Sequence, residues 1–139
     1  MKKAIILLLF SFLNICFSSA QDTLRNPCRD KTHEDIQKTI AQYRQLLLQQ
    51  PGNQKLHYEL GMCYWKLHDP TTALRYFDTV ISLNPHYGAV FSNRGLCKYF
   101  LKDTIGACED FKKCIEYDKD YDNEIGSKSL SQYIKEHCK

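Results

Sequence analysis

Cysteine is the residue with the greatest potential for chemistry in this chain, which contains seven of them. A thiol acts as a nucleophile, a metal ligand or a disulfide partner, according to its pKa and its neighbours. No two of the seven form a Cys-x-x-Cys pair, the spacing that lowers the pKa of a thiol in disulfide exchange enzymes. The five histidines are scattered, without the paired spacings of zinc ligands. The sequence therefore predicts no metal site, no cofactor and no enzyme, and a thiol-based enzyme is kept as an alternative.

The first twenty residues have the pattern of a secretory signal peptide. Two lysines precede an apolar run over residues 4–17, and three small residues at 18–20 offer a cleavage site. The run is too short to span a bilayer comfortably, since a spanning helix takes about 20 apolar residues. We therefore expect cleavage after Ala20, export to the periplasm or the medium, and a mature chain without a transmembrane segment. Cys16 allows the alternative of a lipoprotein, although Ile15 is bulky for the position before a lipidated cysteine.

The mature chain would have a near-neutral charge. Loss of Lys2 and Lys3 reduces the 19 basic residues to 17, against 16 acidic ones. Nucleic-acid binding asks for a basic stripe, so this role is not expected. Loss of Cys16 leaves six cysteines, an even number that permits a disulfide framework with about 15 possible connectivities.

A period of 34 residues positions the elements around these cysteines. Asp35, Tyr43 and Pro51 align with Asp69, Phe77 and Pro85, and then with Asp103 and Phe111. Such a period is typical of stacked helical hairpins. Apolar spacing and end signals predict helices at Asp35–Gln50, Gln54–Leu67, Pro70–Leu83, Tyr87–Leu101, Thr104–Tyr117 and Glu124–His137. Asp35 is the expected cap of the first helix, and an extended lead over residues 21–34 precedes it.

Two stretches resemble the tetratricopeptide repeat. Residues 54–87 carry its signature positions at Leu60, Gly61, Tyr64, Ala73, Phe77 and Pro85. Residues 88–121 match at Phe91, Gly95, Ala107 and Phe111 and depart at Arg94, Lys98 and Lys119. The resemblance, to small exported bacterial proteins of this family, implies an all-α solenoid of helical hairpins over residues 35–139. Its parts would be a half repeat (35–53), two full repeats (54–87 and 88–121) and a capping helix (122–139).

In this family the first helix of each hairpin lines a concave groove that binds a partner. The resemblance implies a partner-binding set at Tyr58, Met62, Trp65, Asn93, Leu96 and Tyr99. Asn93 stands where many members hold the backbone of an extended peptide. Tyr58 and Met62 replace residues with which some members clamp a terminal carboxylate, so that specificity is not expected. The alternative for Trp65 and Tyr99 is packing between hairpins or under the terminal helix.

Three cysteines, Cys63, Cys97 and Cys114, occupy positions where the repeat takes small residues, which favours packing in the core. The terminal helix should run antiparallel to Thr104–Tyr117, and similar exported proteins combine the stretch Gly106–Asp110 with a near-terminal cysteine. Both arguments predict a Cys108–Cys138 disulfide. A Cys28–Cys63 pair is a further possibility, in which the lead folds back.

The leading hypothesis is a non-catalytic protein–protein interaction module of the cell envelope, which binds a peptide or a protein surface in its groove. The alternative is a structural component that assembles as a homodimer through the apolar face of the helix Asp35–Gln50.

Overall fold

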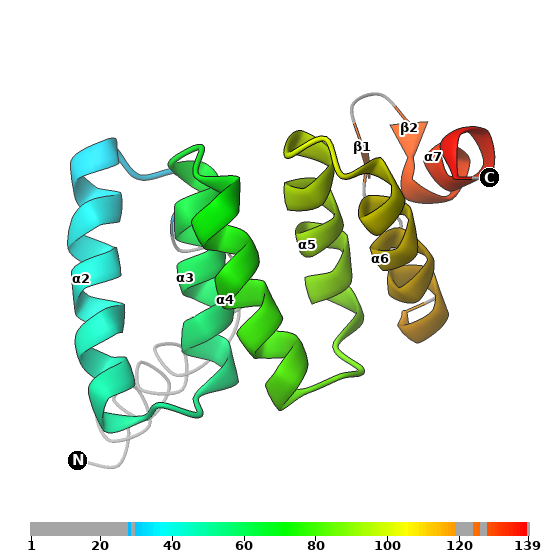
Figure 1. The fold of residues 1–139 in the computed structure, drawn as a ribbon. Helices are drawn as coiled ribbons and strands as arrows, with labels where there is room; N and C mark the ends of the chain where they lie inside the picture. Colours follow the sequence, from blue (N-terminus) through cyan, green and yellow to red (C-terminus); the bar gives the residue numbers. More distant parts are fainter. Residues whose placement is uncertain (1–27, 29, 119–123, 126–127, 139) are drawn as a thin grey trace, which may run out of the picture.

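The computed structural model describes residue 28 and residues 30–118, 124–125 and 128–138. In order, the elements are α2 (His33–Gln49), α3 (Gln54–Lys66), α4 (Pro70–Leu83), α5 (Gly88–Phe100), α6 (Thr104–Tyr117), β1 (Glu124–Ile125), β2 (Lys128–Ser129) and α7 (Leu130–His137) (Figure 1). The expected signal peptide lies outside the described residues. Among those described, no helix has the length and apolar character needed to cross a membrane.

Side-chain caps set the starts of five helices. Thr32, Asn53, Asp69, Asp103 and Ser129 each accept a hydrogen bond from the backbone N–H three residues further on. A cap satisfies a donor that has no partner inside the helix. Pro70 follows its cap directly, where its missing N–H costs nothing. Short polar residues therefore divide the chain into hairpins.

Two helix starts differ from the prediction. α2 begins two residues early because Thr32 accepts from the backbone N–H of Asp35 and donates to its carboxylate, so Asp35 supports the cap instead of being it. α7 begins only at Leu130, and Glu124–Ile125 and Lys128–Ser129 form an antiparallel pair of two-residue strands before it. The apolar spacing that predicted a longer terminal helix lies entirely from Leu130 onward, and Ser129 supplies the cap.

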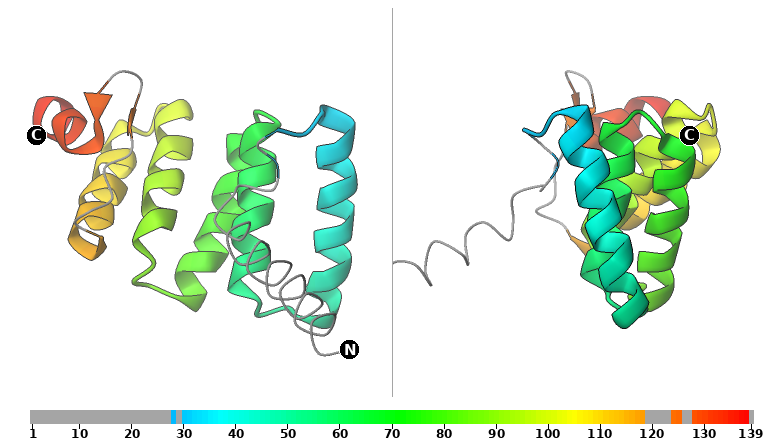
Figure 2. Two further views of the ribbon diagram at one scale, coloured as in Figure 1. Left: turned by 180° about the vertical axis from the view of Figure 1, so that it is seen from behind. Right: turned by 90° about the vertical axis from the view of Figure 1, so that its left-hand side faces the viewer.

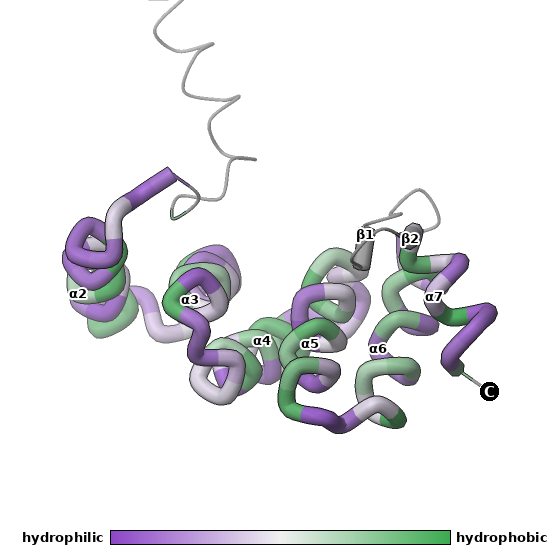
Figure 3. Tube along the Cα trace, turned by 90° about the horizontal axis from the view of Figure 1, so that it is seen from above, coloured by the Kyte–Doolittle hydropathy of each residue, from purple (hydrophilic) through white to green (hydrophobic). Residues whose placement is uncertain are grey.

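The helices form a single row in chain order. Each helix from α3 to α6 packs against its sequence neighbours, while α2 packs mainly on α3 and α7 on α6. Figure 2 gives two further views of this row, and Figure 3 shows its helices from above, with α2 and α7 at opposite ends. A row of this kind has only nearest-neighbour interfaces, so its two ends are stabilised independently of each other.

A glycine under an aromatic ring closes each hairpin. The ring of Phe77 lies against Gly61, and the ring of Phe111 lies against Gly95, so closely that an added Cβ would clash with it. Because these two positions have no side chain, α3 can pack closely on α4, and α5 on α6. A larger residue at either glycine would push the two helices apart. The main core contains Ala73, Phe77, Val80, Val90, Phe91, Cys97, Ala107, Phe111, Cys114, Leu130 and Tyr133. A second cluster joins α2 to α3 through Cys28, Ile36, Ile40, Leu60 and Cys63.

The second hairpin contains a buried ionic network where the first has apolar side chains. Asp110, 1% exposed, accepts two hydrogen bonds from Arg94, from Nε at 2.8 Å and Nη2 at 2.6 Å. Lys98 Nζ lies 2.9 Å from the same carboxylate, and Arg94 Nη1 also reaches Asp78 at 2.7 Å. The residues 34 positions earlier are Leu60, Tyr64 and Tyr76. The departures at Arg94 and Lys98 therefore have a shared explanation, because Asp110 forms ion pairs with both cations.

Candidate functional site

The six residues expected to bind a partner lie on α3 and α5. The set is Tyr58, Met62 and Trp65 on α3 and Asn93, Leu96 and Tyr99 on α5. Within each helix the three are spaced by three or four residues, so they share one helix face. All six are at least partly exposed, and Tyr99 retains 40% of its accessible surface. The two helices therefore present an apolar and aromatic surface with one amide in it.

A hydrogen bond between Asn93 and Tyr58 joins the two helices. Asn93 Nδ2 donates to the hydroxyl of Tyr58 at 2.9 Å and to the carbonyl oxygen of Ala89 at 3.1 Å. The ring of Tyr58 in turn contacts Tyr87 and Phe77, with centroids 5.5 and 5.9 Å away. Both N–H groups of the amide are thus used, and its Oδ1 accepts no hydrogen bond within the part of the chain that the structure describes. An acceptor held in place on such a surface suits a backbone N–H of a bound segment.

A row of aromatic rings crosses the same face. Trp65 meets Phe100 edge to face at 5.1 Å, Phe100 meets Tyr99 at 5.9 Å, and Tyr99 meets Tyr133 of α7 at 5.7 Å. Trp65 and Tyr99 are thus linked through Phe100, and Tyr99 also packs against the terminal helix. Tyr133 was missed by the sequence prediction, although it follows Tyr99 by one further period of 34 residues. α7 therefore takes the place of the first helix of a third hairpin.

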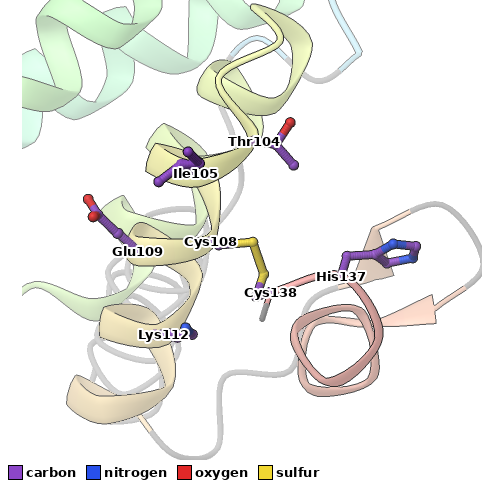
Figure 4. Close-up of a pocket in the computed structure, with 7 residues that line it drawn as sticks. All are labelled: Thr104, Ile105, Cys108, Glu109, Lys112, His137 and Cys138. Atoms are coloured by element: carbon purple, nitrogen blue, oxygen red, sulfur yellow. A yellow bond between two sulfur atoms is a disulfide. The ribbon is translucent and has the colours of Figure 1, made fainter.

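Both expected disulfides are present. Cys28 is bonded to Cys63 and Cys108 to Cys138, with Cα atoms 5.5 and 5.4 Å apart. The favoured interpretation of Cys63 as a free core thiol is therefore wrong, although its side chain is fully buried. It is wrong because the lead brings Cys28 against α3, a contact with no signal in the helical pattern. The second disulfide lines a cleft of about 250 Å³ between α6 and α7. Figure 4 shows the residues that line this cleft.

The two free cysteines of the described residues are poor nucleophiles. Cys97 and Cys114 are both fully buried. Burial raises the pKa of Cys97 to about 12 and that of Cys114 to about 11, because an apolar surrounding disfavours the thiolate. An activated thiol needs the opposite shift. These two side chains act as small apolar residues, as the sequence indicated.

Glu59, next to Tyr58, is a buried carboxylate, although the resemblance placed it among the residues of α3 that face away from the core. Its side chain is on α3, the residue is 8% exposed, and its Oε2 atom has no hydrogen-bond partner among the described residues. Burial raises the pKa of this carboxyl from 4.5 to about 7, and the charge of Lys55 opposes the rise. The carboxylate thus costs free energy at neutral pH.

The pH dependence of stability should reveal this cost. Because the pKa of Glu59 is higher in the folded chain, the folded state binds this proton more tightly, and stability falls as pH rises from about 4.5 to 7. Glu59→Gln lacks this titration. Between pH 4 and pH 8 the difference in unfolding free energy between the two proteins should shift by up to about 3 kcal/mol in favour of the variant. Urea unfolding at both pH values measures it, and parallel profiles would contradict the assignment.

Comparisons with known proteins agree with this architecture. Two family models described as tetratricopeptide repeat match residues 55–87 and 89–121. No match is found among curated protein sequences. Among solved structures, the crystal structure of MamA is 18% identical with a TM-score of 0.61, over 63% of this chain and 52% of that one. The chain thus spans about half the length of MamA.

A second solved structure covers more of the chain. It is the first TPR of Spaghetti (RPAP3) bound to the HSP90 peptide SRMEEVD, 17% identical with a TM-score of 0.65 over 76% of this chain and 79% of that one. Identities this low support the fold, and the family models add the repeat signature. The two central hairpins of this chain therefore belong to the tetratricopeptide repeat family.

Proposed function

We propose that this protein is a non-catalytic binding module that holds an extended segment of a protein partner on the face of α3 and α5. The observation that carries the proposal is the Asn93–Tyr58 contact within a partly exposed apolar surface. A fixed acceptor supplies backbone recognition, while Met62, Leu96 and Trp65 supply apolar contact area. No chemistry by the protein itself is required.

The similar RPAP3 structure supports this type of function because its hairpins carry a bound peptide. The peptide itself is not transferred to this chain. At the positions where some members of the family place clamp residues for a terminal carboxylate, this chain has Tyr58 and Met62. We therefore expect a different partner chemistry.

We further propose that the module works outside the cytoplasm, in the cell envelope or after secretion. Two disulfides support this location, since such bonds persist mainly in oxidising compartments. The signal-like pattern of residues 1–20 points the same way. The partner would then be another envelope or secreted protein.

Symmetric assembly through α2 has weaker support. Leu46 and Leu48 on this helix are 40% and 77% exposed. Residues two positions apart point to different sides of a helix, so these two leucines do not form one continuous apolar face.

The test is capture of partners from envelope extract by the immobilised protein. Asn93→Ala combined with Leu96→Lys should reduce capture of specific chains by more than tenfold, because it removes the fixed acceptor and places a charge among apolar contacts. Arg75→Ala is the matched control, since Arg75 is exposed on α4, a helix that contributes none of the six residues. Circular dichroism verifies that both variants stay folded. Equal capture by the variant with Asn93→Ala and Leu96→Lys and by the Arg75→Ala control would refute the proposal.

A further inference from the structure

A hollow of about 420 Å³ lies at the hairpin-turn end of the face just described. It is lined by Trp65, Lys66, His68, Pro70 and Phe100. Trp65 follows Tyr58 by seven residues, a rise of about 10 Å along α3, so the hollow is separate from the Asn93 contact. Its volume falls within the range of about 300 to 1,000 Å³ that is usual for small ligand sites. It can therefore hold one large side chain of a partner.

The walls of the hollow are apolar and open to solvent. Phe100 is 61% exposed although it is among the largest apolar side chains of the molecule. Its ring is positioned by the edge-to-face contact with Trp65, with Pro70 also lining the hollow. Burial of such a ring by a partner removes a large apolar area from water, which is the usual origin of a binding hot spot.

The polar side chains of the lining are basic. Lys66 and His68 are exposed, and neither forms an ion pair within the described part of the chain. The nearest acid in sequence, Asp69, is engaged in capping α4, where its Oδ1 accepts from the backbone N–H of Thr72 at 3.0 Å. An apolar floor with a lysine at its edge suits a large apolar side chain that stands next to a carboxylate.

The backbone at this turn adopts an unfavourable conformation. His68 and Lys102 have φ values of 59° and 68°, in the left-handed region where glycine is preferred after a helix. Both follow a first helix of a hairpin, one period apart. A side chain at such a position costs about 1 to 2 kcal/mol. His68 lines the hollow and Lys102 does not. Lys102 can therefore serve as a control lysine outside the hollow.

We propose that this hollow receives a Phe-sized side chain of the bound segment and that Lys66 pairs with an Asp or Glu side chain directly after it. The inference deepens the proposed function and rests on it. The carboxylate comes from a side chain and not from a chain end, because capture of a chain end takes several converging donors. Here one lysine and one histidine line the site.

The chain contains one tryptophan, so the fluorescence of Trp65 reports directly on the hollow. The probes are ten-residue Gly/Ser peptides, acetylated and amidated, with a central Phe-Glu, Phe-Gln, Phe-Lys or Ala-Glu pair. Phe-Glu should shift the emission saturably and bind roughly fivefold more tightly than Phe-Gln, as expected for a partly exposed charge pair. Ala-Glu should bind at least about tenfold more weakly than Phe-Glu, because it lacks the apolar anchor. Phe-Lys should bind most weakly among the Phe peptides.

Variants assign the effect to named residues. Lys66→Gln should remove the preference for Phe-Glu over Phe-Gln, Lys102→Gln should keep it, and Phe100→Ala should weaken all Phe peptides. Equal binding of Phe-Lys and Phe-Glu, or no emission change with any peptide, would overturn the inference. So would tighter binding of a peptide ending in Phe with a free carboxylate. Asn93→Ala separates the two proposals, since it should impair partner capture and leave these short peptides unaffected.

Discussion

Replacement of Asp110 by asparagine should destabilise the protein by about 3 to 5 kcal/mol, the usual cost of leaving a buried charge without its partner. Asp110 is 1% exposed and forms ion pairs with Arg94 and Lys98, whose side chains are only 15% and 19% exposed. Asparagine keeps the shape of the side chain but removes the negative charge. The two cations then stay largely out of water without compensation. Urea unfolding at pH 7 monitored by circular dichroism measures the loss.

Two further variants separate this network from its neighbours. Asp78→Asn removes another carboxylate that contacts Arg94, but Asp78 is 48% exposed, so its loss should cost less than about 1 kcal/mol. The triple variant R94L/K98Y/D110Y installs the residues found 34 positions earlier. It should be close to the wild type in stability or above it, because apolar side chains often replace a buried ionic network without loss. Equal small losses for Asp78→Asn and Asp110→Asn would contradict the account.

The helical hairpins were predictable because their causes are local. Asp69 and Asp103 cap helices, and Pro70 is suited to the first turn of α4. Gly61 lies under the ring of Phe77, where only a residue without a side chain fits. All of these signals act within one hairpin and recur at one period, so a single sequence reveals them. The same locality explains why α3 to α6 lie close to the predicted ranges.

The errors concern contacts between elements that are distant in sequence. The burial of Glu59 and the charge balance at Asp110 depend on which helices become neighbours. The Cys28–Cys63 bond was only one possibility for the same reason, because it depends on the contact between the segment before α2 and α3. No periodic pattern encodes such contacts. The start of α7 was predicted too early for another reason. This helix has eight residues, too few for its apolar periodicity to define where it begins. For the binding face, the resemblance indicated the helices, and the structure shows that Phe100 connects Trp65 with Tyr99 and that Tyr133 connects Tyr99 with α7.

Removal of the Cys28–Cys63 disulfide, by alanine at both positions, should cost about 4 kcal/mol at the α2 end, as loop closure over a separation of 35 residues predicts. The bond ties the segment before α2 to α3, and α2 itself packs mainly on α3. α2 should therefore open more often, while α5 and α6 keep their other contacts. Hydrogen exchange of amides in α2 should accelerate by more than a hundredfold, because the free energy of local opening of this helix falls by about 4 kcal/mol.

The matched variant removes Cys108–Cys138 at the other end. α7 has eight residues, too few to form a stable helix alone, and its anchors are this disulfide with Leu130 and Tyr133. Exchange in α7 should accelerate, and exchange in α2 should stay unchanged. An array with nearest-neighbour interfaces is weakest at its ends, because each end helix packs against a neighbour on one side only. Each disulfide thus compensates for the stabilisation that the missing neighbour would provide. Equal acceleration in all helices of both variants would instead show that the row unfolds as one cooperative unit.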